Sequence, residues 1–151
     1  MNTRLKMTKN EDSFDEFVDQ LQQEIIQEEL KEYNEYIVNL FHNPQNWGKP
    51  KDFTIEESYK GSCGDTMQFF LKINNGIVED VHFLTDGCGA SVATGSQTSL
   101  MAKGKPIEEV EKLTAKEIDE ALHGLPADHK HCAALAATTL KKAIKKYKNK
   151  T

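Results

Sequence analysis

The chain has 151 residues and a formal net charge of −5, which fits one main domain, with or without an appendage, that buries a substantial core. The negative charge argues against nucleic acid as the main partner, and no apolar run reaches the roughly 18 residues that a membrane helix needs. Because the start also lacks the apolar core of a signal peptide, we expect a soluble, cytoplasmic protein.

The N-terminal region is acidic and has a helical pattern. Residues 11–35 contain ten acidic side chains and a single lysine. Residues 1–12 are expected to fray, and Ser13–Glu16 then fits a capping box followed by apolar residues at helical spacing. The pattern continues to Asn43 and Pro44, where proline stops a helix. We therefore predict one long or broken amphipathic helix, most simply a docking helix with a solvated acidic face, and alternatively an acidic recognition surface.

A β-hairpin is the strongest local signal in the middle of the chain. Asn75 and Gly76 lie between two β-prone apolar runs, and both central residues of the tightest hairpin turn need a positive φ. Residues 66–84 are therefore predicted to form a hairpin. Residues 53–59 are predicted to form a further antiparallel strand, which gives three strands.

The hairpin directs two cysteines toward each other. With a two-residue loop, paired positions have numbers that sum to 151, as those of Cys63 and Cys88 do. A three-residue loop pairs Cys63 with Gly87 instead and gives a cleaner apolar face. Either register leaves the thiols as neighbours if the pairing extends that far, and the glycine after each cysteine allows backbone or a bulky inorganic ligand to come close. With the carboxylate of Asp65, these groups form a plausible metal corner.

Helices are predicted for the rest of the chain. The small residues from 89 to 101, followed by Lys103 and Gly104, favour a helix packed close to the sheet. Pro106 and a capping box at Thr114–Glu117 mark two short helices, and an alanine-rich pattern from about 131 to 148 marks a last helix.

The third cysteine, Cys132, is predicted at the start of the last helix, just as Cys88 is predicted where the small-residue helix begins. The dipole and free N–H groups of a helix N-terminus favour thiolate, and cations at His129, Lys130 and His131 would add to this effect. Three cysteines in a reducing compartment suggest metal or catalysis before disulfides, although scattered buried cysteines are the simpler alternative. The hairpin and the two helix starts favour a site.

Several motifs occur in the order and spacing of a known family. They are Asn43–Gly48, Cys63–Asp65, Gly87–Ser91, Lys103–Lys105, Leu125-Pro126 and His131-Cys132. On these motifs the segment from about Tyr36 to Tyr147 resembles the IscU/NifU-type iron–sulfur cluster assembly scaffolds. The resemblance implies an α+β domain over residues 31–151, in which helices pack on one face of a small three-stranded antiparallel sheet. Residues 1–30 are then an acidic helical N-terminal extension.

The resemblance also implies a binding site for a transient two-iron, two-sulfur cluster. The implied metal ligands are Cys63, Asp65, Cys88 and Cys132, with His131 as an alternative cluster ligand. Thiolates suit iron–sulfur centres, and a hard carboxylate in the set would make the site labile, as a scaffold requires. Structural or surface positions are expected for the other histidines, namely His42, His82, His123 and His129.

The function that the resemblance implies is cluster assembly, which is not an enzymatic activity. A pyridoxal-phosphate cysteine desulfurase would deliver persulfide sulfur, with Cys132 as the candidate acceptor, and iron would enter at the same corner. The cluster would then pass to apo-proteins. The absence of any Cys-x-x-Cys argues against a small thiol redox enzyme.

The alternative function is that of a zinc-bearing, SufU-like sulfur acceptor that stimulates a desulfurase. The same thiols and Asp65 would bind zinc tetrahedrally, and zinc is also the alternative metal of the protein as isolated. Two features argue against this alternative. The chain lacks the insertion that SufU-like chains carry between the second and third cysteines, and it has His131 before the last cysteine.

Three departures from the family pattern concern partners. Ala127–Lys130 stands where chaperone-assisted members carry Pro-Val-Lys-Leu or similar, which makes dependence on the dedicated heat-shock chaperone pair doubtful. The sequence has no further NifU module after the scaffold domain, and the acidic extension has no assigned role. The expected partners are a cysteine desulfurase and apo iron–sulfur acceptor proteins, without nucleic acid or membrane, and a homodimer is left open.

Overall fold

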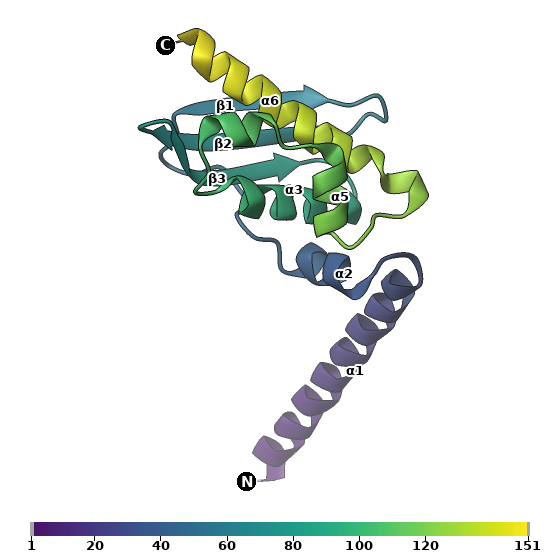
Figure 1. Cartoon of the computed structure of the whole chain (residues 1–151). Coiled ribbons are helices and arrows are strands. Elements are labelled where there is room, and N and C mark those ends of the chain that lie inside the picture. The colour runs from purple at the N-terminus through teal and green to yellow at the C-terminus, as the bar shows by residue number, and fades with distance from the viewer. Residues whose placement is uncertain (1, 151) are drawn as a thin grey trace. The chain divides into compact units, whose positions relative to one another are not determined.

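The structure is a computed structural model that describes residues 2–150, with side chains from Ser13 onward. Contacts within the chain group it into two units, Met1–Tyr33 and Asn34–Thr151. The first unit contains one helix, α1 (Asn2–Glu32), and the second contains every other described element (Figure 1).

Helix α1 is longer than predicted. Neither glycine nor proline occurs between Asn2 and Glu32, so nothing in the sequence interrupts a helix there. The expectation that residues 1–12 fray is therefore wrong for residues 2–12, and Met1 lies outside the described residues. The predicted apolar stripe of this helix is exposed at Phe14, Phe17, Leu21 and Ile25.

The predicted break in the N-terminal helical region occurs at Asn34, the N-cap of α2 (Glu35–His42). The side-chain oxygen of Asn34 accepts a hydrogen bond from Ile37 N at 2.9 Å, while its amide nitrogen donates to Leu122 O at 2.9 Å. Asn34 therefore both starts the helix and joins it to the segment before the last helix. Helix α2 ends at Asn43, before Pro44, as predicted.

The second unit is built on an antiparallel sheet in the order β1-β2-β3 (Figure 1). Its strands are β1 (Ile55–Lys60), β2 (Thr66–Asn74) and β3 (Ile77–Thr85). Its helical elements beyond α2 are α3 (Gly89–Ala102), α4 (Ile107–Glu111), α5 (Ala115–Ala121), η1 (Ala127–His129) and α6 (His131–Lys150). The predicted three-stranded sheet and the four predicted helices are confirmed. None of the described helices combines the length and the apolar character that crossing a membrane requires.

Of the two loop lengths that the sequence allowed, the hairpin turn has the two-residue loop. Asn75 and Gly76 both have positive φ, 55° and 75°, which matches the twist of the flanking strands. The register next to the turn is the first of the two expected, because Ile73 pairs with Val78. Beyond this pair neither expected register continues, because a β-bulge leaves Glu79 unpaired and shifts the rest of β3 by one position.

The bulge keeps Glu79 off the apolar face of the sheet. Without it, strict alternation would place Val78 and Val81 on opposite faces of the sheet. With it, both valines are fully buried and Glu79 is exposed. Phe69 then lies directly opposite Phe83 on the covered face. One extra residue thus supplies the apolar face that the alternative register was predicted to give.

Helices pack on one face of the sheet, as predicted. Helix α6 contacts β1 and β2, α3 contacts β3, and α5 packs on α6 (Figure 1). The largest fully buried side chains of the core between these layers include Phe69, Phe83, Ile118, Leu122, Leu140 and Ile144. The core holds the N-terminal ends of α3 and α6 at the same end of the sheet, which positions the site.

Small residues let α3 lie directly against the sheet. A Cβ atom at Gly95 would overlap the ring of Phe83, so no other residue fits there without movement. Two of its buried hydroxyls bond to the backbone of the helix itself: Thr94 Oγ1 donates to Ala90 O at 2.6 Å, and Ser99 Oγ donates to Ser96 O at 2.7 Å. The predicted close packing of this helix is therefore explained by both size and hydrogen bonding.

The segment Asn43–Gly48 covers the outer edge of β3. Gly48 N donates to Phe83 O at 2.9 Å, and Phe83 N donates to Asn46 O at 3.0 Å. Asn46 has a positive φ of 63° and donates from its side chain to Ser99 Oγ at 2.9 Å. This motif therefore has a structural role, because it ties the edge of the sheet to α3.

Candidate functional site

The sequence-predicted ligands lie on three connections at one end of the sheet. Cys63 and Asp65 are in the loop between β1 and β2, Cys88 is the N-cap of α3 directly after β3, and Cys132 is the second residue of α6. Gly61 N donates to Asp65 O at 2.9 Å and closes the first loop. The predicted helix-start positions of both later cysteines are confirmed.

Three of the donors form a compact group that could hold a metal ion. One ligand atom each from Cys63, Asp65 and His131 lies within 4.8 Å of the other two. Cys132 adjoins this group, with its Sγ 3.7 Å from His131 Nε2. Two thiols, a carboxylate and an imidazole therefore face one another.

Ser91 joins the carboxylate to the buried thiol. Its Oγ lies 3.4 Å from Asp65 Oδ2 and 3.5 Å from Cys132 Sγ, and Ser91 itself is fully buried. A Cβ at Gly87 would overlap the Ser91 side chain and lie 3.0 Å from Asp65 Oδ2. The glycine before Cys88 is thus needed so that Ser91 and Asp65 can approach the loop.

Cys88 lies on the other side of the site, beside a second histidine. Its Sγ is 3.9 Å from His129 Nδ1, and its side chain is exposed. Burial raises the pKa of Cys132, and the nearby Cys88, Asp65 and Cys63 raise it further, so Cys132 lies within electrostatic range of each of these three groups. Of the five expected ligands, the structure thus groups Cys63, Asp65 and His131, places Cys132 beside His131, and places Cys88 beside His129.

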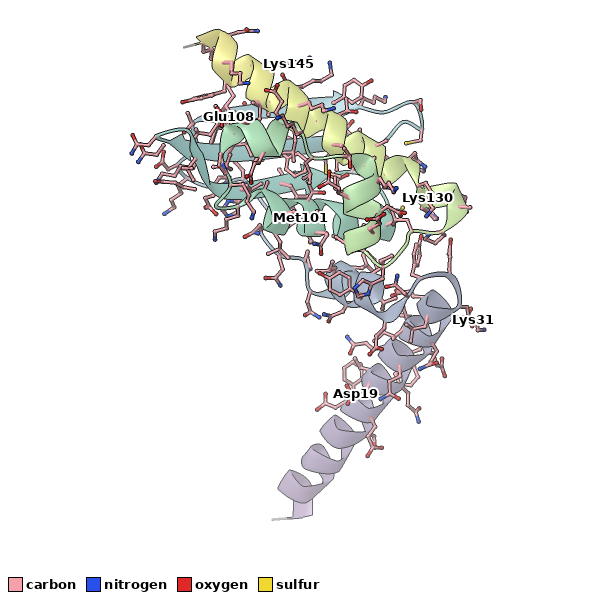
Figure 2. The ribbon with its side chains drawn as sticks, viewed as in Figure 1. Asp19, Lys31, Met101, Glu108, Lys130 and Lys145 are labelled. Atoms are coloured by element: carbon pink, nitrogen blue, oxygen red, sulfur yellow. The ribbon has the colours of Figure 1, made fainter. Side chains whose placement is uncertain are left out.

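The expected thiolate character of Cys132 is wrong for this structure. Burial raises the pKa of its thiol to about 11, Ser91 opposes this through its hydrogen bond, and the neighbouring negative charges raise it further. The lysine that was expected to favour thiolate, Lys130, which is labelled in Figure 2, is paired elsewhere, since its Nζ lies 2.9 Å from Asp119 Oδ2. Lys130 is thus close to Cys132 in the sequence, but it forms an ion pair with Asp119 and not with the thiol.

The site is open on the side of Cys63. A cavity of about 210 Å³ adjoins it. It is lined by Tyr59, Gly61, Ser62, Cys63, His131, Ala134, Leu135 and Thr138. Cys63 and Cys88 are exposed whereas Cys132 is buried, so a partner can reach two of the thiols in this conformation.

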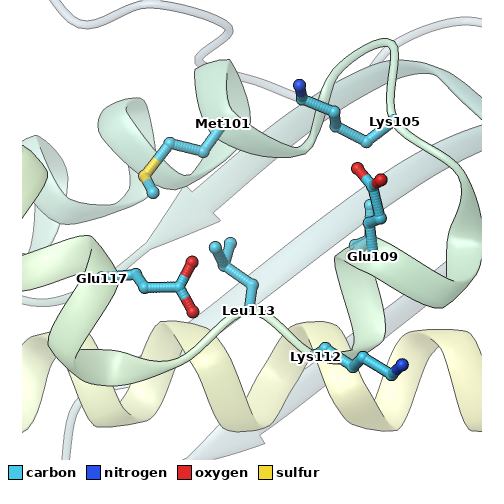
Figure 3. Close-up of a pocket in the computed structure, with 7 residues that line it drawn as sticks. Met101, Lys105, Glu109, Lys112, Leu113 and Glu117 are labelled. Atoms are coloured by element: carbon cyan, nitrogen blue, oxygen red, sulfur yellow. The ribbon is translucent and has the colours of Figure 1, made fainter.

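A larger pocket of about 450 Å³ lies away from these residues (Figure 3). Its lining consists of Met101, Lys105, Glu109, Val110, Lys112, Leu113 and Glu117. Met101 is thirteen residues after Cys88 on the same helix, roughly 20 Å along its axis at about 1.5 Å per residue. No thiol or imidazole lines this pocket, so the metal chemistry belongs to the cysteine end of the sheet.

Two residues of the site were not recognised from the sequence. His129 was expected to be structural or exposed, yet its side chain is only 18% exposed and approaches Cys88. Ser91 was recognised only as a member of the Gly87–Ser91 motif. The cluster of histidines before Cys132 was the available signal for His129, and no sequence signal distinguishes Ser91 from the other small residues of α3.

This fold and site define a class of protein: an α+β domain whose thiols, carboxylate and imidazoles converge to receive a soft metal centre. The NifU-like N terminal domain profile matches residues 32–151, and the chain belongs to that family.

Comparison with individual proteins agrees with the family assignment. The chain is 44% identical over 119 residues to the iron-sulfur cluster assembly scaffold protein IscU of Aquifex aeolicus, covering 77% of this chain and 76% of the relative. That relative is named as a scaffold protein, in keeping with the expected non-enzymatic role.

Solved structures share the fold. An N-terminal NifU-like protein of Brucella abortus superposes with a TM-score of 0.64 at 16% identity, covering 80% of this chain and 96% of that chain. A SUF-system scaffold candidate (FiSufU) of Fervidobacterium islandicum gives a TM-score of 0.61 at 21% identity, covering 74% and 96%. Both likenesses concern the fold.

Proposed function

We propose that this chain is a scaffold on which a two-iron, two-sulfur cluster is assembled and from which the cluster passes to apo-proteins. The observation that carries the proposal is the meeting of three thiols, one carboxylate and one imidazole at an accessible end of the sheet. The scaffold name of the relative from Aquifex aeolicus supports the same role. The cluster is cargo in this function, so the site must both bind it and release it.

Sulfur enters as a persulfide from a pyridoxal-phosphate cysteine desulfurase. A thiolate of the scaffold attacks the outer sulfur of the desulfurase persulfide, the sulfur–sulfur bond breaks, and the desulfurase thiolate leaves. Two electrons from an external reductant then convert the transferred sulfur to sulfide for the cluster. The open cavity beside Cys63 gives a donor loop room to reach the site.

The buried position of Cys132 suggests the order of events. Its thiol is protonated at neutral pH because its pKa is about 11, and a protonated thiol is a poor nucleophile. Metal binding removes protons from coordinating thiols. We therefore expect persulfide on Cys132 only after Fe²⁺ is present. Mass spectrometry of the scaffold after incubation with desulfurase and cysteine, with and without Fe²⁺, tests this order, and equal sulfur on Cys132 in both samples would contradict it.

Asp65 supplies the lability that a scaffold needs. A carboxylate oxygen matches iron in a sulfide cluster less well than a thiolate does, so water or an acceptor thiol can replace it. Its hydrogen-bond contact with Ser91 at 3.4 Å holds it beside the buried thiol. We infer that the cluster leaves from the iron that Asp65 binds.

The zinc-bearing sulfur acceptor is the second candidate. The donor group of Cys63, Asp65 and His131, together with the adjoining Cys132, has the four ligands that tetrahedral zinc prefers. The two functions differ in what the protein does after sulfur arrives, because a zinc acceptor passes on sulfur without building a cluster. Metal analysis after anaerobic purification separates them, together with visible absorption.

The partners that we propose follow from this function. They are a cysteine desulfurase and apo iron–sulfur proteins, in a reducing cytoplasm that keeps the three thiols free. The segment Ala127–His129 forms the turn η1 and brings His129 to the site, so we propose a local role for it and no dependence on a dedicated chaperone.

The decisive experiment is anaerobic assembly with desulfurase, cysteine, Fe²⁺ and a reductant. We expect visible absorption of a cluster that depends on the desulfurase and then moves to apo-ferredoxin. Cys88→Ser should weaken cluster binding, whereas Asp52→Ala should not, because that exposed carboxylate pairs with Lys72 at 3.2 Å. If zinc stays bound and no cluster forms while the desulfurase turns over, the scaffold proposal fails and the zinc alternative stands.

A further inference from the structure

The histidine beside Cys88 has the position of a metal ligand. His129 Nδ1 lies 3.9 Å from Cys88 Sγ, a separation that allows both atoms to bind one ion. The neighbouring residues of η1, Ala127 and Asp128, are exposed, whereas the His129 side chain is only 18% exposed. The imidazole is therefore directed toward the protein and the site, away from bulk solvent.

Asp128 lies on the opposite side of the same imidazole. Its Oδ2 is 3.8 Å from His129 Nε2, so one ring nitrogen faces a carboxylate and the other faces a thiol. At 3.8 Å this is a charge contact and not a hydrogen bond, so the carboxylate lies beside Nε2 while Nδ1 is the ring nitrogen nearer to Cys88. The adjacent residues Asp128 and His129 thus present Nδ1 to the space beside Cys88.

The two histidines of the site serve different sides of it. His131 Nε2 lies 3.7 Å from Cys132 Sγ and belongs to the donor group with Cys63 and Asp65. The ring centroids of His129 and His131 are 6.2 Å apart, so the rings are neighbours on one turn of the chain. Each side of the site therefore pairs thiol sulfur with an imidazole nitrogen.

We propose that His129 is a metal ligand on the Cys88 side of the site and exchanges with the Cys88 thiolate. Cys88 is exposed and can be given up to a partner thiol, while His129 keeps the ion in place. Imidazole suits both iron and zinc, so either metal would accept the exchange. The inference rests on metal binding at the proposed site and does not depend on cluster assembly.

Co²⁺ is the probe that tests this ligand, because it replaces zinc and iron in mixed sulfur and nitrogen sites and can be loaded without any desulfurase. X-ray absorption of the Co²⁺-loaded, anaerobic protein counts sulfur and imidazole ligands. The test background is Cys88→Ala combined with His131→Asn, which removes the exchanging thiol and the other histidine. We expect one bound imidazole in this background and none after His129→Asn is added.

The affinity for Co²⁺, measured with Cys88 present and in the Cys88→Ala background, gives a second readout. His129→Asn should weaken Co²⁺ binding little while Cys88 is present, and by at least about tenfold once Cys88→Ala is in place, because the two residues replace each other. The matched control is His123→Asn, which removes an exposed histidine stacked on Tyr36 at a centroid distance of 4.8 Å. Asparagine tolerates the positive φ of 63° at that position.

Two results would overturn the inference. One is the absence of imidazole from Co²⁺ in the Cys88→Ala and His131→Asn background, including the case in which that protein binds no Co²⁺ at all. The other is an affinity for Co²⁺ that, in the Cys88→Ala background, His129→Asn changes no more than His123→Asn does. If the His129 variant does not fold, the imidazole count in the chain that retains His129 still decides. Since no desulfurase or sulfide is used, a failure here leaves the scaffold function untouched.

Discussion

The buried thiol of Cys132 predicts a loss of stability in alkaline solution. Its pKa is about 11 in the folded chain, against an ordinary value of 9.0. Between these values the unfolded chain has released this proton and the folded chain still holds it, so the free energy of unfolding falls as the pH rises. The contribution is fully present below pH 9.0 and is lost by about pH 11. At about 1.4 kcal/mol per pKa unit, the loss is on the order of 3 kcal/mol.

Denaturant unfolding of the metal-free, reduced chain measures this loss. Lysines, tyrosines and the other two thiols also titrate in alkaline solution, so the quantity to follow is the difference between wild type and Cys132→Ala. The substitution removes one buried sulfur and costs on the order of 1 kcal/mol of packing at every pH. The advantage of wild type over the variant should therefore shrink from pH 9.0 to about pH 11. A difference that stays constant over this range would show that burial does not hold the proton.

Three further variants test the neighbouring groups. Asp65→Ala removes the proposed oxygen ligand, so a reconstituted cluster should persist longer in air and transfer more slowly to apo-ferredoxin; decay as fast as in Cys88→Ser would refute the account of lability. Gly95→Ala places a methyl group against the ring of Phe83 and should lower the free energy of unfolding by about 1 to 3 kcal/mol in denaturant titrations. Ser91→Ala removes the hydrogen bond that lowers the pKa of the buried thiol, so thiol alkylation should need a still higher pH, and an unchanged alkylation profile would contradict the assigned contact.

Local signals were enough to predict most of the fold. Asn75 and Gly76 fix the turn because few residues adopt two consecutive positive φ angles, and Pro44 and Thr114 mark helix ends through backbone chemistry that acts within a few residues. The bulge at Glu79 could not be predicted, since it depends on which side chains the helices cover after the layers pack. No glycine or proline interrupts helix α1 between Asn2 and Glu32, although its full length was not predicted.

The sequence predicted that the three thiols lie at one end of the sheet, but not the positions of Ser91 and His129 or the electrostatics of the site. The hairpin and two helix starts were sufficient to place Cys63, Cys88 and Cys132 at one end of the sheet. The pKa of Cys132 depends on how α3 and α6 bury it, and the ion pair of Lys130 with Asp119 depends on where α5 packs. Neither the burial of the thiol nor the ion pair can be predicted from the spacing of residues in the sequence.

Because the outer edge of β3 is covered, the places where another strand could pair with this sheet are limited. Residues Asn46–Gly48 bond to one part of that edge, and Lys105 O accepts from Val78 N at 2.9 Å near its beginning. Strand β1 is left as the edge at which a foreign strand could add to the described sheet. There Lys146 Nζ already donates to Glu56 O at 2.9 Å, and a lysine at a sheet edge opposes pairing with another chain. Such protection keeps a protein that must expose reactive thiols at one end from aggregating through its backbone at the side.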